Sequence, residues 1–219
     1  MKKLEKRINL ELHNEILEIH KKVRKDIDKA IKGYKKSWEK SEKEVFSEIA
    51  FCILTPQSKA KNAWSAITKL VENNLLYTGT VDELVDYLNV VRFKNNKAKY
   101  LIELRDLMTR DGKLQPRAIL SEQGDVLEKR EWILKNIKGV GMKEANHVLR
   151  NLGFGKEIAI LDRHILRNLL GLSVIDEVPK TLTIKKYYEI EEKMREYSLF
   201  AGINMDELDL TLWYKEAGE

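Results

Sequence analysis

Cysteine is almost absent from the sequence, since Cys52 is the only one among 219 residues. A single thiol excludes an intramolecular disulfide, a cysteine-ligated cluster and a zinc site that depends on several cysteines. Cys52 stands in the apolar run FCILT, where a buried thiol without a chemical role is expected. We therefore expect neither a metal nor another cofactor.

Long apolar runs are also absent, and the excess of positive charge is small. No run approaches the length of a membrane span, and the N-terminal stretch is charged throughout, unlike a secretory signal. The 40 Lys and Arg residues against 35 Asp and Glu residues give a formal net charge of +5. This balance is compatible with nucleic-acid binding but does not require it. We expect a cytoplasmic protein without a membrane partner.

Proline and glycine are scarce, at three and 11 residues, and no segment alternates as a strand would. Apolar residues recur at helical spacing instead, which predicts an all-α fold of many short helices. The length suits one large lobe or two small lobes that share a cleft. Ser41 and Glu44 form a capping-box pattern at the start of a helix that Thr55-Pro56 ends. Gly112 is expected to follow the C-terminus of a later helix.

The stretch NIKGVGMKEANHVL combines a turn with the start of a helix. Gly139 and Gly141 flank Val140, and two glycines allow positive φ angles and a close approach to another molecule. The N–H groups of this turn and of the helix start are expected to form a small anion-binding nest. A nucleic-acid phosphate is the expected guest, and such a contact does not depend on base sequence.

Lys143 follows this turn at the expected start of the helix. An ammonium is unfavourable at the positive end of the helix dipole, so the position favours the neutral amine, more so if the amine is partly desolvated. A neutral amine is a nucleophile that forms Schiff bases. In the structural alternative, Lys143 merely faces solvent or a phosphate, and this stretch alone does not exclude it.

Asp162 follows the apolar run IAIL and precedes a short helix. As a plain N-cap, its carboxylate would accept a hydrogen bond from the N–H of His164 or Ile165. A carboxylate held at a helix start can also stabilise a developing cation and accept a proton. The structural and the catalytic interpretation of Asp162 are compatible.

Together these motifs resemble a known superfamily. IKGVGMKEANHVL followed by ILDRHILR looks like the helix-hairpin-helix DNA glycosylases, in which a catalytic Lys follows the hairpin and a catalytic Asp lies in an Asp-x-His segment. The lack of a C-terminal cysteine cluster, the LTPQS segment and the ending LDLTLWYKEAGE are most similar to the archaeal-type 8-oxoguanine DNA glycosylase/AP lyase family, over roughly residues 40–219. The resemblance implies one glycosylase unit, 1–219, of two helical subdomains, with the hairpin motif at about 131–150, at the cleft.

The resemblance also implies roles for five residues. Gly139, Val140 and Gly141 would hold the DNA backbone through main-chain N–H groups. Lys143 would attack C1′ of the flipped nucleotide as the base leaves, and β-elimination from the resulting Schiff base would nick the strand. Asp162 would stabilise the positive charge that grows on the sugar and help to deprotonate the lysine.

Further residues are candidates for contacts to the flipped base or to the base stack: Pro56, Gln57, Phe93, Asp209 and Trp213. The Pro56 carbonyl would accept a hydrogen bond from the N7–H that 8-oxoguanine has and guanine lacks. Gln57 would enter the gap left by the flipped base. Phe93 and Trp213 would stack on the purine, and Asp209 would accept from its N1–H or N2–H.

Structural alternatives stay open for these candidates. Gln57 is equally an exposed loop residue. Trp213 falls at helical spacing with Leu208 and Leu212, a pattern typical of core residues. In the stretch around Phe93, the neighbouring Arg92, Lys94 and Lys97 would suit phosphate contacts. The histidines His147 and His164 are expected to be structural, because no cluster of metal ligands accompanies them.

The implied function is a bifunctional repair enzyme that excises 8-oxoguanine from double-stranded DNA, works as a monomer and is cytoplasmic in a prokaryote, on the nucleoid when bound to DNA. The alternatives are an endonuclease III-like glycosylase for oxidised pyrimidines, a non-catalytic hairpin module that only binds phosphates, and a helical scaffold whose hairpin is only a tight turn. In the family the chain end reaches the base pocket and usually runs to a lysine. This sequence stops at Glu219, so that contact differs or the chain is a shortened form.

Overall fold

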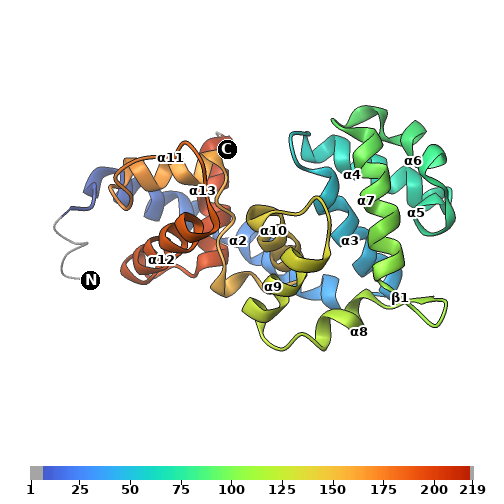
Figure 1. Cartoon of the computed structure of the whole chain (residues 1–219). Helices are drawn as coiled ribbons and strands as arrows, with labels where there is room; N and C mark the ends of the chain where they lie inside the picture. Colours follow the sequence, from blue (N-terminus) through green and yellow to red (C-terminus); the bar gives the residue numbers. More distant parts are fainter. Residues whose placement is uncertain (1–6, 218–219) are drawn as a thin grey trace. The chain divides into compact units, whose positions relative to one another are not determined.

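The computed structural model describes residues 7–217 and is mostly helical (Figure 1). In chain order its helices are α2 (Leu10–Glu39), α3 (Glu42–Leu54), α4 (Ala60–Glu72), α5 (Leu75–Thr78), α6 (Val81–Tyr87), η1 (Leu88–Val90), α7 (Lys94–Leu107), α8 (Pro116–Ser121), α9 (Val126–Asn136), α10 (Met142–Asn151), η2 (Gly155–Glu157), α11 (Arg163–Gly171), α12 (Ile184–Ala201) and α13 (Met205–Ala217). The all-α prediction is confirmed. Glu219, whose contact with the base the sequence left open, lies outside the described residues.

The chain divides into two compact units. We call residues 36–152 the hairpin unit, because it contains the glycine turn and Lys143. Residues 7–35 and 153–217 form the terminal unit, which contains Asp162 and the last helix. The cleft expected from the sequence stays a prediction.

The hairpin unit is built around α3, whose side chains from Val45 to Leu54 are all buried except that of Glu48. A helix that is buried on every side belongs at the centre of a core, and α3 packs against α4, α7 and α10. The capping box is confirmed: the Ser41 hydroxyl accepts the Glu44 N–H, and the Glu44 carboxylate accepts the Ser41 N–H at 3.1 Å. Thr55 is the C-cap, so the predicted end of this helix is also confirmed.

The prediction for Gly112 is wrong. The helix before it, α7, already ends at Leu107, and a short antiparallel hairpin of β1 (Thr109–Arg110) and β2 (Lys113–Leu114) follows. Gly112 and the preceding Asp111 form its two-residue turn, with φ angles of +69° and +52°. An Asp-Gly pair suits a turn in which both central residues have positive φ, whereas strands of two residues are too short to show alternation.

The terminal unit packs α2 against α13. Val23 and Ile27 of α2 form a buried cluster with Leu210 of α13. Beside it, the His20 ring nitrogen Nε2 and the Arg24 guanidinium lie 3.2 and 3.0 Å from Oε2 of Glu207. Burying each aliphatic side chain contributes about 1.5–3 kcal/mol. The first half of α13 is therefore anchored to α2.

The longest helix of the described residues, α2, has 30 residues, and charged side chains occur throughout it. Within residues 7–217, no helix has both the length and the apolar character that crossing a membrane requires.

Candidate active site

The glycine turn connects α9 to α10, so the helix-hairpin-helix segment spans 126–151 and is longer than the predicted 131–150. Its two helices are held together by apolar side chains that are at most 4% exposed: Ile133, Ile137, Val148 and Leu149. Asp125 caps α9 by accepting the N–H groups of the second and third helical residues at 2.8 and 2.9 Å. The start of α9 is therefore capped, and apolar contacts hold α9 to α10 on the two sides of the turn.

Only one of the two glycines needs its conformational freedom. Gly139 has φ +78°, and a Cβ atom on it would lie 2.4 Å from Cδ2 of Tyr100. Gly141 has φ −100° and ψ −175°, which is extended backbone open to any residue. The expectation of positive φ angles is therefore confirmed for Gly139 and wrong for Gly141. The Tyr100 ring fills the space that a side chain on Gly139 would need.

The anion nest has two donors available. Within residues 7–217, no acceptor binds the N–H of Gly139 or of Val140, as expected for a nest. The N–H of Gly141 differs, because it donates to Oε2 of Glu144 at 3.3 Å. A phosphate at this turn finds two free donors and a third that a carboxylate already holds.

Lys143 is the second residue of α10, and its side chain is 32% exposed. Its Nζ lies 3.0 Å from Oε1 of Glu144, the same carboxylate that binds Gly141. The Glu144 side chain is only 14% exposed, so solvent screens this ion pair incompletely. Glu144 thus connects the amine to the turn.

Asp162 is the N-cap of α11, as predicted. Its Oδ1 accepts the N–H of His164 at 2.8 Å and that of Ile165 at 2.9 Å. Within the described part of the chain, no hydrogen bond involves the other oxygen, Oδ2. The carboxylate is therefore held rigidly by one oxygen while the other can interact with a substrate.

The end of α13 is tied to the helix that Asp162 caps. Glu216 accepts hydrogen bonds from Nδ1 of His164 at 3.0 Å and from Nδ2 of Asn168 at 2.8 Å. The hydrogen bond from His164 is the main reason why the pKa of Glu216 is lowered. His164 therefore has the structural role expected for it.

Pro56 and Gln57 are the central residues of a tight turn between α3 and α4, closed by a 2.9 Å hydrogen bond from the Ser58 N–H to the Thr55 carbonyl. Gln57 is exposed and has φ +54°, which is uncommon for a residue other than glycine. Such a conformation costs on the order of 1 kcal/mol or more. The position of Gln57 in an exposed loop is confirmed, and its role on DNA stays a prediction.

Phe93 precedes α7 and also has a positive φ, +60°. This residue is 54% exposed. The guanidinium of Arg92 lies 5.6 Å from the centre of its ring. The N–H of Arg92 donates to Oγ of Ser58 at 3.0 Å, so the loop that carries Phe93 is joined to the Pro56-Gln57 turn. The phosphate contact considered for Lys97 is wrong, because this residue is only 4% exposed.

On α13, Leu208 and Leu212 are fully buried, but Trp213 is 55% exposed. The core interpretation is confirmed for the leucines and wrong for Trp213, whose ring packs edge-on against Tyr214 with the centroids 5.2 Å apart. Asp209 lies one turn before Trp213 and is buried. Trp213 therefore offers a ring face, whereas Asp209 is a buried carboxylate.

Among residues 7–217, no group of three His, Cys, Asp or Glu side chains is placed to hold a metal ion. The His147 ring lies edge-on to Phe51, with the centroids 5.7 Å apart. Burial, aided by the cation of Arg150, lowers the pKa of His147 to about 3, so the ring is neutral. Cys52 is buried as expected, and burial raises the pKa of its thiol.

Comparison with known proteins assigns the family. The model of the Ogg-HhH family, described as "8-oxoguanine DNA glycosylase", matches residues 27–203. A protein of Fusobacterium nucleatum named 8-oxoguanine DNA glycosylase/AP lyase is 58% identical over 209 residues, which cover 95% of this chain and 96% of that protein. The chain belongs to the 8-oxoguanine DNA glycosylase family.

Solved structures of this glycosylase family have the same fold. The 8-oxoguanine DNA glycosylase of Methanocaldococcus jannaschii is similar with a TM-score of 0.84 and 35% identity, covering 96% of this chain and 95% of that one. The Methanocaldococcus jannaschii glycosylase/lyase in complex with a 15mer DNA containing 8-oxoguanine gives a TM-score of 0.82 and 33% identity, covering 93% and 97%. The helix-hairpin-helix fold is therefore shared over nearly the whole chain.

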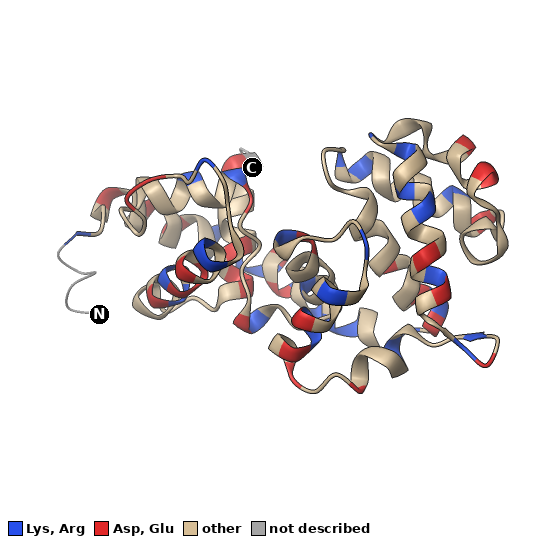
Figure 2. Cartoon of the chain, in the orientation of Figure 1, with Lys and Arg blue, Asp and Glu red and all other residues tan. Residues whose placement is uncertain are grey.

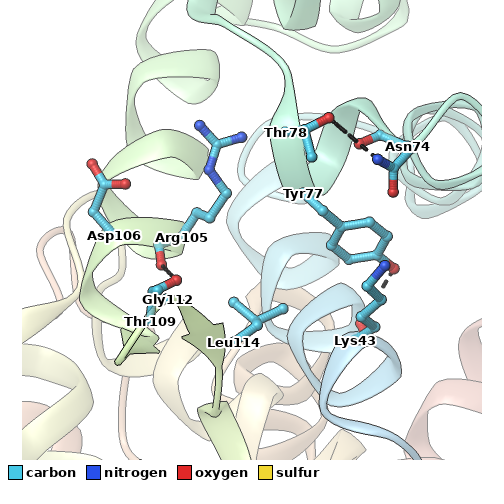
Figure 3. A pocket seen from close by; sticks show the side chains of 9 residues that line it. All are labelled: Lys43, Asn74, Tyr77, Thr78, Arg105, Asp106, Thr109, Gly112 and Leu114. Carbon is cyan, nitrogen blue, oxygen red and sulfur yellow. Dashed lines mark hydrogen bonds between the residues drawn. The ribbon is translucent and has the colours of Figure 1, made fainter.

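The hairpin unit also has a hollow of about 530 Å³ that is lined by none of the predicted site residues (Figure 3). Lys43 lies beside the Tyr77 ring, 4.6 Å from its centroid, and Arg105 also faces the hollow. Arg105 donates to the Gly79 carbonyl at 2.9 Å. Both cations thus already have partners within the fold.

Charge does not mark a nucleic-acid-binding surface on either unit. Figure 2 shows Lys and Arg interleaved with Asp and Glu along the helices of both units. The excess of five positive charges is therefore spread over the chain. Local features such as the free N–H groups of Gly139 and Val140 are better markers of a phosphate site.

Sequence reasoning missed three residues that shape this candidate site. Glu144 binds both Lys143 and the turn. A Glu three residues after the N-cap, as Glu144 is after Gly141, is the capping pattern that indicates such a contact. Tyr100 packs where Gly139 lacks a side chain, and nothing in its sequence context indicates this. Lys97 looked like a surface cation because it stands among other basic residues.

Proposed function

We propose that this chain is a bifunctional 8-oxoguanine DNA glycosylase/AP lyase, which excises 8-oxoguanine from double-stranded DNA and cleaves the strand at the resulting site. The observation that carries the proposal is the 58% identity to the Fusobacterium nucleatum glycosylase/lyase over 95% of the chain. The relative solved with DNA containing 8-oxoguanine supports the same substrate.

Lys143 is the proposed nucleophile. Its neutral amine attacks C1′ of the flipped nucleotide and forms a C–N bond, while the bond from C1′ to the base breaks and the base leaves with that electron pair and a proton. Opening of the sugar ring then gives a Schiff base. Support comes from the position of Lys143 in the first turn of α10, beside two N–H groups that are free to bind phosphate.

The Schiff base accounts for the lyase step. It makes the C2′ proton acidic, and when a base removes this proton the electron pair forms the C1′–C2′ double bond of an enamine. The 3′-phosphate then leaves from C3′, which nicks the strand. Hydrolysis of the Schiff base frees Lys143 for the next turnover.

Asp162 is the proposed electrostatic partner in this reaction. The sugar becomes positively charged as the base leaves, and a fixed carboxylate stabilises that charge without having to reorganise. The two hydrogen bonds to Oδ1 support this role because they orient the free Oδ2. Asp162 is also proposed to help remove the proton from Lys143.

The hairpin and the exposed aromatic residues are proposed to hold the nucleotide. The N–H groups of Gly139 and Val140 bind a backbone phosphate, and that of Gly141 joins them once Glu144 releases it. Phe93 and Trp213 are proposed to stack on the flipped base, for which their exposure is a precondition.

Pro56, Gln57 and Asp209 are proposed to select the base. The Pro56 carbonyl accepts the N7–H of 8-oxoguanine, and Gln57 occupies the space that the flipped base leaves in the stack. Asp209 accepts N1–H or N2–H from the purine. We further propose that the enzyme acts as a monomer, since one bent duplex is its substrate, and that it works in the cytoplasm of a prokaryote on nucleoid DNA.

Strand cleavage of a duplex with a single 8-oxoguanine, measured with and without borohydride, tests the proposal. Wild type should cleave the strand and be trapped covalently by borohydride. In Lys143→Gln the cleavage rate and the yield of trapped complex should both fall by about a thousandfold or more. Asp162→Asn should cleave about a hundredfold more slowly while keeping its helix cap. Faster cleavage of a thymine-glycol duplex than of the 8-oxoguanine duplex would favour the oxidised-pyrimidine alternative. Binding that is steeply salt-dependent, without trapping, would favour a non-catalytic hairpin module.

A further inference from the structure

Lys97 is a buried cation that the proposed reaction does not use. It lies on α7 with 4% exposure, and its Nζ donates to the carbonyl of Leu54 at 2.7 Å, to that of Pro56 at 2.8 Å and to Oγ of Ser58 at 3.1 Å. An ammonium has three N–H donors, and each has an acceptor here. Lys97 therefore has no donor left for a DNA phosphate.

Ser58 is equally saturated, and it joins two loops. Its Oγ accepts from Lys97 and, at 3.0 Å, from the N–H of Arg92. Its own hydroxyl donates to the Pro56 carbonyl at 3.4 Å. The α3–α4 turn and the loop before α7 are thus connected through one hydroxyl and one ammonium.

Both connected loops carry a strained residue at an exposed position. Gln57 and Phe93 have φ angles of +54° and +60°, although neither is a glycine. Bulky residues keep such angles only where the surroundings enforce them. The hydrogen bonds of Lys97 and Ser58 are the constraints that lie next to both residues, since Lys97 also donates its main-chain N–H to the Phe93 carbonyl at 3.0 Å.

We propose that Lys97 is a positioning residue for base recognition: it aims the Pro56 carbonyl and holds the Gln57 and Phe93 loop tips, without touching DNA. This inference rests on the proposed function of those three residues. The Pro56 carbonyl accepts from the Lys97 ammonium at 2.8 Å, which fixes the direction of its second lone pair; that lone pair holds only the longer bond from the Ser58 hydroxyl, 3.4 Å, which the N7–H of the base would displace. Misplacing a recognition group by about 1 Å can lower a rate by about a hundredfold.

The protonation of Lys97 supports this role. Burial lowers its pKa to about 8, and the carboxylate of Glu144 opposes the shift. The neutral amine has two N–H donors for three acceptors, so one link is lost as the pH rises through about 8. The two loops should therefore become less tightly held within the pH range in which the protein can be assayed.

Two substrates separate positioning from a general structural role. Excision of 8-oxoguanine needs the base to be recognised, whereas a preformed abasic site has no base to recognise. Under single-turnover conditions, Lys97→Met should slow excision by about tenfold or more and leave abasic-site cleavage within about twofold. Lys99→Met, an exposed lysine on the same helix, is the matched control and should change neither rate.

Ser58→Ala provides a second variant in case Lys97→Met folds poorly. It removes the link to Arg92 but no buried charge, and it should slow excision selectively by a smaller factor. In wild type, the ratio of excision to abasic-site cleavage should fall above about pH 8.

The outcomes are distinguishable. Equal loss on both substrates in folded variants, or unchanged excision in both Lys97→Met and Ser58→Ala, would overturn the inference while leaving the proposed function intact. A wild-type protein that cleaves neither substrate would overturn the proposed function, and the inference would fail with it.

Discussion

The side-chain nitrogen of Lys143 lies 3.0 Å from one carboxylate oxygen of Glu144, and the other oxygen accepts the N–H of Gly141 at 3.3 Å. One carboxylate thus pairs with the proposed nucleophile and also accepts a hydrogen bond from part of the proposed phosphate site. A DNA phosphate that reaches the turn repels Glu144 and competes with it for the Gly141 N–H. Binding of DNA should therefore loosen the hold of Glu144 on Lys143.

Replacing Glu144 by glutamine should tighten DNA binding. The amide can still accept the Gly141 N–H, but the negative charge beside the phosphate is gone, so the dissociation constant should fall by about twofold to fivefold at low salt. The measurement is a titration of a duplex that contains an uncleavable abasic analogue, at two salt concentrations.

Glu122→Gln is the matched control for this experiment. Glu122 is also in the hairpin unit and pairs with Arg110 at 2.6 Å, so its replacement changes the net charge equally. An equal gain in both variants would mean that total charge, and not the position of Glu144, governs affinity.

Replacing Gly139 by alanine should destabilise the hairpin unit more than replacing Gly112. Both glycines have positive φ, but a Cβ on Gly139 meets the Tyr100 ring at 2.4 Å, whereas a Cβ on Gly112 has no neighbour within 4 Å. We expect losses in the free energy of unfolding of about 2 kcal/mol or more and about 1 kcal/mol, respectively. Denaturant unfolding measures both. If the two losses are equal, the Tyr100 contact contributes nothing and only φ matters.

Replacing Gln57 by glycine should separate stability from activity. Glycine tolerates φ +54° but frees the unfolded chain, so the free energy of unfolding should stay within about 1 kcal/mol of wild type. The amide is lost, so excision of 8-oxoguanine opposite cytosine should slow. Gln57→Asn, which keeps a shorter amide at the same φ, should fall between the two in rate. Full activity in the glycine variant would remove the proposed role of Gln57 in the stack.

Replacing Glu216 by glutamine should weaken the protein in a pH-dependent way. The pKa of Glu216 is lowered, chiefly by its hydrogen bond from His164. A carboxyl group with a lowered pKa stabilises the folded state above its unfolded pKa, and this contribution disappears as the pH falls through the folded value. The difference in unfolding free energy between wild type and Glu216→Gln should therefore shrink between about pH 5 and pH 3. A difference that is constant across this range would contradict the assignment.

Local chemistry in the sequence was a good guide where one short segment determines the structure. The Ser41 capping box, the end of α3 at Thr55 and the Asp162 cap each depend on residues within four positions, and all three are confirmed. The glycine turn before Lys143 was found for the same reason. The roles of these residues in catalysis stay predictions.

Long-range packing explains what the sequence could not show. Trp213 has core spacing, yet its ring is exposed because Leu208 and Leu212 already fill the inner face of α13. Lys97 stands among surface lysines in the sequence, but it is buried because three acceptors, 39 to 43 residues away along the chain, meet its ammonium. No pattern within one helix encodes either outcome.

The burial of Cys52 makes the folded protein unreactive toward maleimides and other thiol reagents, since these react with an accessible thiolate. A cysteine introduced at an exposed position would thus be the one site that takes up a fluorophore while the fold is intact. Conversely, slow labelling of Cys52 itself would time the transient opening of α3, the central helix of the hairpin unit, without any mutation.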